Sequence, residues 1–311
     1  YGESIYTDRV EVIGNYELPM KERVIFSGSY SYHEQDSYYG LTPYFAKQHI
    51  GYGQFVWHKK MNTRSTLLSG VAIRYNYFDD NTVATSLGDS LTMVNHPDNW
   101  ILPGLFVQDN FKLNEKVRIL AGGRFDYHQK HVSIITPRLN IKVDPNSKNE
   151  LRVGYGNGFR VVNIFTEDHA ALTGAREVVI SEKLKPEKSH NININYVTRI
   201  NKKNTYLTLD GSIFYTHFSN KIIPDYDSND DKIIYSNLNG YAISQGVSLN
   251  VRLLFEIPLR INFGGTLLDV YSMEENSNGN MERVQQLFAE KYTGTWSVSY
   301  QFEKLNASID Y

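Results

Sequence analysis

The chain has 311 residues, a formal net charge of −2 and no cysteine, which excludes disulfide scaffolds, thiolate metal sites and cysteine nucleophiles. Its nearly balanced charge argues against a nucleic-acid partner. Aromatic residues make up 13% of the chain and include 23 tyrosines, whose apolar ring and polar tip suit boundaries between water and lipid. There is no run of about 18 apolar residues that would predict a membrane helix.

About fourteen segments alternate between apolar and polar side chains, the pattern of strands whose two faces have different surroundings. Most are longer than the about 5–6 residues of soluble strands and reach the about 9–11 that a tilted membrane strand needs. The last segment is too short to span a bilayer. In chain order, the predicted strands are 4–17, 23–34, 47–58, 65–78, 101–113, 117–128, 134–144, 150–158, 189–200, 205–218, 240–256, 259–271, 288–302 and 306–311.

The connections between these strands alternate in length. Short turns rich in Asn, Asp, Pro and Lys are followed by long loops predicted at 35–46, 79–100, 159–188, 219–239 and 272–287, whereas the connection at 129–133 is brief. Residues 165–172 are compatible with a short helical turn. Short turns on one rim and long loops on the other predict an antiparallel up-and-down transmembrane β-barrel.

The polar face of the strands carries charges that would be costly in lipid. A charged side chain facing mid-membrane lipid costs about 2–4 kcal/mol, so these residues predict a wet interior or a packed domain inside the barrel. The apolar face is then expected to face lipid. The residues predicted to face the lumen or a plug are Arg74, Arg118, Arg124, Asp126, Arg138, Arg152 and Arg252.

Five short motifs in succession resemble those of TonB-dependent receptors. They are F-V-Q-D within 106–109, G-G-R-F-D within 122–126, T-P-R at 136–138, G-Y-G-N-G-F-R at 154–160 and L-K-P-E-K-S at 184–189. Each motif is weak alone, but five in the family's order and in the expected strand context are specific. One departure is Val161-Val162, where many members have Ala-Pro, and it prevents a transfer of substrate identity.

The resemblance implies a barrel of about 22 strands in the outer membrane of a Gram-negative bacterium, with an N-terminal plug domain and a TonB box. The chain shows neither a plug nor a signal peptide, so we interpret 1–311 as one incomplete barrel segment from the middle of a longer receptor. The implied partners are outer-membrane lipid, a TonB energy transducer acting through the plug, a small-molecule or metal-chelate ligand, and a surface lipoprotein.

Aromatic and histidine side chains in the long loops are the candidates for ligand contact: Tyr38, Tyr39, Tyr44, His96, Trp100, His169, Tyr226 and Tyr235. A His or Tyr pair there could hold a ferric siderophore, haem or cobalamin, and an oligosaccharide also remains open.

An enzyme is not expected, because the H-E-x-x-H, G-x-S-x-G and P-loop motifs are absent from the sequence, and no cofactor is predicted. Two alternatives to a receptor share some of the pattern. One is a passive porin with a constriction loop in its lumen. The other is a soluble all-β surface-binding protein, which predicts strands of about five or six residues.

Overall fold

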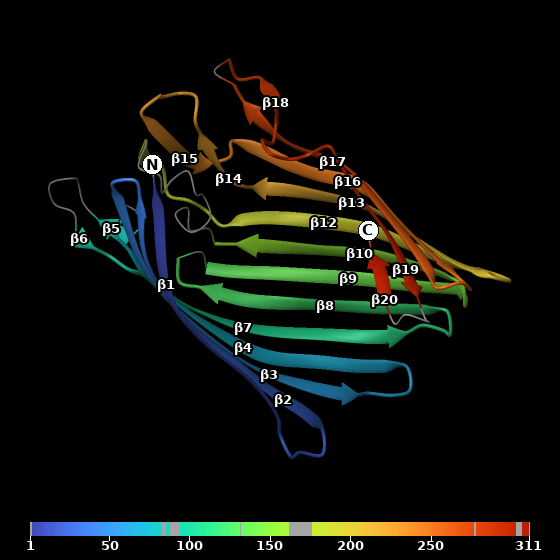
Figure 1. The fold of residues 1–311 in the computed structure, drawn as a ribbon. Helices are drawn as coiled ribbons and strands as arrows, with labels where there is room; N and C mark the ends of the chain where they lie inside the picture. Colours follow the sequence, from blue (N-terminus) through green and yellow to red (C-terminus); the bar gives the residue numbers. More distant parts are fainter. Residues whose placement is uncertain are drawn as a thin grey trace.

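The computed structural model describes residues 2–82, 85–87, 94–130, 132–161, 176–276, 278–302 and 307–310. Its main element is one antiparallel sheet in which strands follow each other in chain order, and the sheet curves into a trough (Figure 1). The path contains β1 (Glu3–Glu17), β2 (Arg23–Tyr39), β3 (Thr42–Lys60), β4 (Ser65–Asp80), β7 (Asp98–Lys112), β8 (Val117–His128), β9 (Val132–Asn146), β10 (Asn149–Arg160), β12 (Glu187–Lys202), β13 (Thr205–Asn220), β16 (Gly240–Phe255), β17 (Leu259–Glu275), β19 (Tyr292–Phe302) and β20 (Ala307–Asp310).

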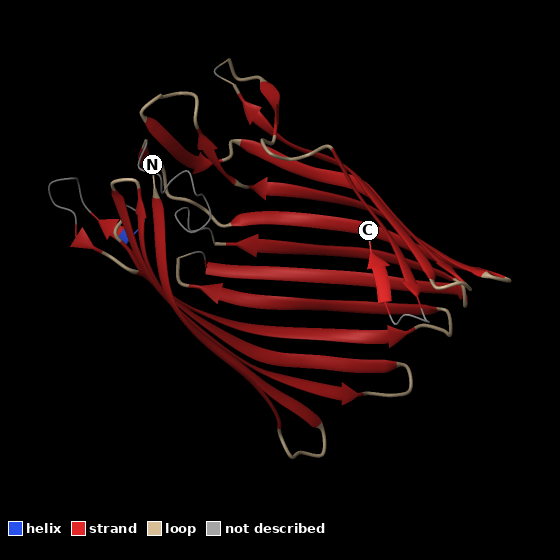
Figure 2. Ribbon diagram, viewed as in Figure 1, coloured by secondary structure: helices blue, strands red, loops and turns tan. Residues whose placement is uncertain are grey.

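Each predicted strand coincides with one strand of this path, so the prediction of an antiparallel barrel fold is confirmed. Strand lengths from β1 to β19 on the path range from 11 residues in β19 to 19 in β3. The alternative of a soluble protein with short strands does not fit these lengths. Figure 2 shows how completely strands dominate the described chain. No helix among the described residues has the length and apolar character that a membrane crossing requires.

Two of the predicted loops are wrong. Residues 35–46 continue β2 and β3 as a paired ladder, with Asp36 opposite Phe45, up to a tight turn at 40–41. Gly40 has a φ of 66°, which a two-residue hairpin turn requires and glycine adopts without strain. Residues 272–287 likewise contain the end of β17 and the added strand β18 (Met281–Gln285), which pairs with it. The strand predicted at 288–302 begins only at Tyr292.

Asparagine closes several turns at the short-turn rim. The Asn62 side-chain oxygen accepts hydrogen bonds from the backbone amides of Arg64 and Ser65 at 2.7 and 2.9 Å. Asn114 and Asn146 bind the amides two and three residues ahead in the same way. An asparagine side chain that replaces the backbone acceptor stabilises a tight reversal, which explains why these connections are brief.

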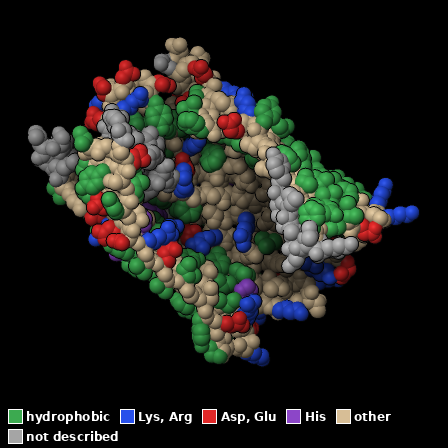
Figure 3. All heavy atoms as spheres, viewed as in Figure 1, with side chains coloured by type: hydrophobic (Ala, Val, Ile, Leu, Met, Phe, Trp, Pro, Cys, Tyr) green, Lys and Arg blue, Asp and Glu red, His purple; other side chains and the backbone are tan. Residues whose placement is uncertain are grey.

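The register separates two faces of the sheet. Arg124 of β8 lies opposite Thr136 of β9, whereas the adjacent Phe125 lies opposite Ile135. Phe125 and Ile135 are 40% and 66% exposed, as expected of an apolar outer wall. We call the face with Arg124 the inner face. Figure 3 shows a hollow in which Lys and Arg side chains gather, with hydrophobic side chains on the outer flanks of the wall.

The long connections form additional short strands at the opposite rim of the main sheet. Within the described residues, β11 (Glu177–Ile180), β15 (Lys232–Asn237) and β14 (Ile222–Asp225) form a three-stranded sheet, and β5 (Ser86–Leu87) pairs with β6 (Val94–Asn95). These strands lie beside the ends of the barrel strands in Figure 1. The helical turn predicted at 165–172 lies outside the described residues.

Candidate functional site

The three-stranded sheet joins two connections that are far apart in the sequence. β11 belongs to the connection between β10 and β12, and β14 and β15 belong to the connection between β13 and β16. β11 pairs with β15 in parallel, from Glu177 opposite Lys232 to Ile180 opposite Tyr235. Every strand pair of the main sheet is antiparallel, so this parallel pair is a separate unit, which we call the cap.

Side-chain hydrogen bonds to the backbone hold the two connections together. Arg176 donates to the Tyr226 carbonyl at 2.7 Å. The Asn237 side chain accepts from the Lys185 amide at 2.8 Å and donates to the Lys183 carbonyl at 3.1 Å. The backbone amide of Asn237 in turn donates to Oε1 of Glu182 at 2.9 Å. Because these bonds link both connections at several points, we expect the cap to move as one body.

The cap packs against the opposite part of the wall. One buried cluster unites the β2–β3 hairpin, β4 and the cap, and we call it the tyrosine latch. In the main sheet, β3 is separated from β13, the strand that precedes β14 and β15 in the chain, by β4, β7, β8, β9, β10 and β12, so the latch crosses the rim rather than following it. The latch consists of Tyr39, Tyr44, Ala46, Phe78, Ile233 and Tyr235.

The latch contains three of the predicted ligand residues. Tyr39, Tyr44 and Tyr235 are 6%, 4% and 3% exposed, and a fourth candidate, Tyr226, packs against the cluster while partly buried. These side chains are therefore packed against one another in this conformation. Tyr38 is 42% exposed and lies on the opposite face of the same hairpin.

The remaining ligand candidates lie elsewhere. His96 is exposed, and its amide donates to the Thr85 carbonyl at 2.7 Å. Trp100 is buried on the inner face, where its ring centroid lies 5.2 Å from that of His128. His169 lies outside the described residues. The structure thus does not bring all eight candidates to one place, and their role in ligand contact remains a prediction.

A buried carboxyl lies beside the latch, where β4 ends at Asp80 opposite Ala46 of β3. Asp80 is 8% exposed, and its Oδ1 accepts from the hydroxyls of Thr82 and Thr85 at 2.8 and 2.7 Å. Burial raises the pKa of Asp80 despite these hydrogen bonds. Burial, with a smaller contribution from the Asp80 charge, also raises the pKa of Tyr44. This side of the latch is therefore a poorly solvated region.

Two family-like motifs meet next to the cap. Arg160 ends the glycine-rich motif, and it donates through Nε and Nη2 to Glu187 of the second motif at 2.9 and 2.7 Å. The other oxygen of Glu187 accepts from the Ile222 amide at 3.0 Å, which ties the start of β14 to this ion pair. Lys221 lies beside them, and burial lowers its pKa. This group was not predicted from the sequence, although Arg160 ends β10 and Glu187 begins β12, on either side of one connection.

A cavity of about 530 Å³ opens beside this group and the cap. Its charged and polar lining includes Arg160, Glu187, Lys221, Asp225 and Glu274. Lys221 also donates to the Gln286 side chain at 2.7 Å. Among the residues that the structure describes, no group of three or more His, Asp or Glu side chains is placed to hold a metal ion. The cavity is suited to a polar solute rather than to a bare cation.

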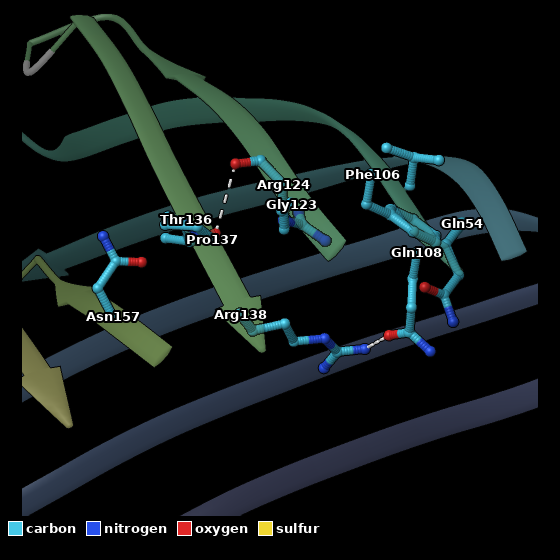
Figure 4. A pocket seen from close by; sticks show the side chains of 10 residues that line it. Gln54, Phe106, Gln108, Gly123, Arg124, Thr136, Pro137, Arg138 and Asn157 are labelled. Carbon is cyan, nitrogen blue, oxygen red and sulfur yellow. Dashed lines mark hydrogen bonds between the residues drawn. The ribbon is translucent and has the colours of Figure 1, made fainter. Parts of the chain in front are cut away.

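The residues predicted to face the lumen share one face of the sheet. Arg124 binds Asp126 at 2.6 and 2.9 Å and lies 5.8 Å from the Phe106 ring centroid. Arg138 donates to the Gln108 side chain across β8, as Figure 4 shows. A cavity of about 320 Å³ lies between these side chains, lined by Gln54, Phe106, Gln108, Arg124, Thr136, Arg138 and Asn157.

Register places the other four arginines on this face as well. Arg118 lies opposite Lys142, which lies opposite Arg152, and Arg252 lies opposite Thr208. Arg74 lies 5.7 Å from the ring centroid of the inner-face residue Trp100. Their contact with a plug domain remains a prediction.

The inner face near the short turns is hollow and charged. A cavity of about 660 Å³ is lined by Arg152, Arg199 and Arg252 together with Glu150 and Asp210. Arg152 binds Glu150 at 2.6 Å, so part of this positive charge is neutralised within the wall. The arrangement can bind polar or acidic groups of another domain.

Long antiparallel strands, an apolar outer wall, a charged inner wall and connections gathered at one rim define a section of a membrane-spanning β-barrel of the outer-membrane class. The chain matches the family described as "TonB dependent receptor-like, beta-barrel" over residues 7–311. It therefore belongs to the TonB-dependent receptors, as the five motifs predicted.

Solved structures agree in fold. The FrpB iron transporter from Neisseria meningitidis matches 98% of this chain with a TM-score of 0.71 and 14% identity. The siderophore receptor PirA from Pseudomonas aeruginosa matches 97% with a TM-score of 0.65 and 16% identity. The ferric enterobactin receptor PfeA from Pseudomonas aeruginosa matches 99% with a TM-score of 0.64 and 13% identity. The comparison with curated proteins gave no match.

The chain spans about half the length of these solved structures, between 49% and 57% of each. Their similarity therefore concerns this section of the fold. What the whole protein binds and transports is a matter for proposal.

Proposed function

We propose that this chain forms part of the wall and the extracellular mouth of an outer-membrane receptor that imports a scarce nutrient into a Gram-negative bacterium. An iron chelate is the first candidate, because the similar structures include an iron transporter, a siderophore receptor and a ferric enterobactin receptor. Haem and cobalamin are the next candidates to test. The wall performs no chemistry in this proposal.

The observation that carries the proposal is the cap across the mouth. Two connections are fused by the β11–β15 ladder and latched by Tyr235 onto Tyr39 and Tyr44 of the far hairpin. A passive pore gains nothing from such a cover, whereas a receptor needs a surface that engages a ligand before it enters. The cavity beside Arg160, Glu187 and Lys221 lies next to the cap and supplies polar groups for that contact.

Transport would proceed in three stages. The ligand binds where the cap meets the wall, a periplasmic TonB energy transducer pulls on a plug region, and the ligand then passes along the inner face. The inner arginines, among them Arg124 and Arg138, would hold the plug by ion pairs and hydrogen bonds. A surface lipoprotein that delivers the ligand to the cap is a further partner in this proposal.

Uptake by cells tests the proposal. A deletion strain is supplied with single iron chelates, haem or cobalamin, and uptake of the labelled compound is measured with and without a functional TonB transducer. We expect one compound class to enter only when both the receptor and the transducer are present. Uptake that persists without the transducer would favour the passive porin. Extraction of the protein without detergent would contradict the membrane placement itself.

A further inference from the structure

Two arginines and a threonine form one row across the inner face of the wall. Arg199 of β12 lies opposite Thr208 of β13, and Thr208 lies opposite Arg252 of β16. Neighbouring strands are about 4.8 Å apart, so the two arginine Cα atoms are separated by about 10 Å, with the threonine between them. All three residues line the cavity of about 660 Å³ near the short turns. We call these three residues the arginine row.

The two carboxylates that line the same cavity are already bound to other side chains. Glu150 binds Arg152 at 2.6 Å, and its second oxygen lies 3.0 Å from Nζ of Lys142. The carboxylate of Asp210 accepts from the side-chain amide of Asn195 at 2.6 Å. Because both carboxylates are engaged in this way, they do not neutralise the arginine row.

The guanidinium groups of the row have donors to offer. Among the residues that the structure describes, neither Arg199 nor Arg252 forms an ion pair. A guanidinium group carries five N–H donors in a planar fork and keeps its charge in proteins. The partner of Arg252 on β17 is Asn262, which lines the cavity as well and adds a neutral amide to the row. The row therefore presents positive charge and hydrogen-bond donors to a group that enters the cavity.

The cavity has the size of a small-molecule site. Pockets for small molecules usually enclose about 300–1,000 Å³ and combine an apolar lining with a few convergent polar groups. The cavity of about 660 Å³ falls within this range, and Val197 and Leu254 supply apolar lining between its polar groups. A concave hollow of this kind suits a small organic solute better than the convex surface of a packed domain.

The arginine row lies far from the cavity beside the cap. Arg199 is three residues from Lys202, where β12 ends at the short-turn rim. The same strand begins at Glu187, which lines the cavity beside the cap. The distance along β12 from Glu187 to Arg199 is about 40 Å, at about 3.3 Å per residue. The row is therefore a separate site, at the end of the wall opposite the cap.

We propose that the arginine row is a second binding site on the import path, which holds a small solute with two or more carboxylates before it leaves the lumen. Each guanidinium group binds one carboxylate through two parallel hydrogen bonds, and the Thr208 hydroxyl donates to an oxygen between them. The inference rests on the proposed function and deepens it, because it names the class of imported compound as a chelate or nutrient built on carboxylates.

Citrate, a small tricarboxylate, is the probe for this site. Its dissociation constant is measured by isothermal titration calorimetry for the full-length receptor in detergent, as wild type, as R199Q/R252Q and as the matched control R260Q. We expect citrate to bind the double variant at least about tenfold more weakly, because a hydrogen bond to a charged group contributes about that factor or more. Arg260 lies on the same face of β17, two residues from Asn262, but outside the cavity lining, so R260Q should bind citrate as the wild type does.

A lysine variant guards against misfolding. R199K/R252K retains both charges, so its folded fraction on heat-modifiability gels should equal that of the wild type. It should still bind citrate more weakly than the wild type, because an ammonium group lacks the planar fork that matches a carboxylate. Wild-type affinity for citrate in either double variant would overturn the proposal. Inorganic phosphate that displaced citrate at equal concentration would show that the row selects charge rather than carboxylates, and it would overturn the proposal too.

Entry of a large antibiotic tests the plug as the other occupant of the row. If the row held the plug, cells with R199Q/R252Q should admit a glycopeptide antibiotic that is too large for porins, and that result would overturn the solute site. We expect these cells to exclude the antibiotic as wild-type cells do. The proposed function fails by a different result, uptake that continues without the TonB transducer, so failure of one proposal can be told from failure of the other.

Discussion

Truncation of Tyr39 tests whether the tyrosine latch holds the cap. Replacing a buried aromatic side chain by alanine costs about 3–5 kcal/mol. Tyr39 is 6% exposed, and its cluster contains residues of the wall as well as of the cap, so we assign about half of that cost, ~2 kcal/mol, to cap attachment. Since about 1.4 kcal/mol is a factor of ten, the open population of the cap should rise about 30-fold in Tyr39→Ala.

Hydrogen exchange measures this opening directly. The amides of β14 and β15 should exchange about 30-fold faster in Tyr39→Ala, whereas those of β16 and β17 in the wall should keep their rates. Tyr38→Ala is the matched control, because Tyr38 is the adjacent residue of the same type, is 42% exposed and points to the other face. If β15 exchanges at the wild-type rate in Tyr39→Ala, or if Tyr38→Ala accelerates it equally, the latch does not hold the cap.

Three further changes probe other parts of the molecule. Arg160→Gln leaves the carboxylate of Glu187 buried without its ion-pair partner. Because Arg160 itself is half exposed, we expect the free energy of unfolding by urea to fall by about 1–2 kcal/mol, less than for a fully buried pair. A change below about 0.5 kcal/mol would show that the pair is dispensable. Burial raises the pKa of Asp80, so its charged form destabilises the folded state. This destabilisation is fully present above the folded-state pKa and disappears as the pH falls below the pKa of an unfolded aspartate, about 3.9. Asp80→Asn should therefore raise the thermal midpoint at pH 7 and match the wild type near pH 3, and a gap that widened in acid would contradict this sign. A Cβ at Gly70 would overlap the Phe55 carbonyl and the Phe106 ring. Gly70→Ala should therefore lower the free energy of unfolding by about 1–3 kcal/mol and reduce the folded fraction on heat-modifiability gels. Gly14→Ala is the control and should assemble normally, because a Cβ there meets no atom within 4 Å.

The strand pattern could be predicted because lipid and water impose opposite demands on alternate residues. In β8 the pair Phe125 and Tyr127 alternates with Arg124 and Asp126, and no other fold explains that alternation over so many long segments. The positions of the short turns could be predicted as well, because residues such as Asn114 stabilise a tight reversal. Both features depend on residues close in sequence.

The hairpin between β2 and β3 could not be distinguished from a loop. Residues 35–46 mix Gln, Asp, Ser, Gly and Pro with tyrosine, a composition that is typical of surface connections. Pairing decides the outcome, because each residue of this segment finds a partner on the other arm up to Gly40. Period-two alternation between exposed Tyr38 and buried Tyr39 is present in the sequence, but burial beneath the cap, rather than lipid, is its cause.

Contacts between distant connections were outside the reach of sequence reasoning. The β11–β15 ladder joins residues more than 50 positions apart, and nothing local in Glu177–Ile180 selects Lys232–Tyr235 as its partner. The ion pair of Arg160 and Glu187 also joins residues of two different motifs, which lie 27 positions apart in the sequence. Recognising that both motifs flank one connection would have placed them together, because adjacent antiparallel strands bring their near ends into register.

The parallel ladder also limits how the exposed surface of this receptor can diversify. Surface connections ordinarily accept insertions and deletions, so related proteins often differ in loop length there. A one-residue length change within Glu177–Ile180 or Lys232–Tyr235 would turn each strand's inner side chains outward and separate Tyr235 from the hairpin. Length differences among relatives should therefore accumulate at the reversal 227–230, while the paired segments change by substitution alone.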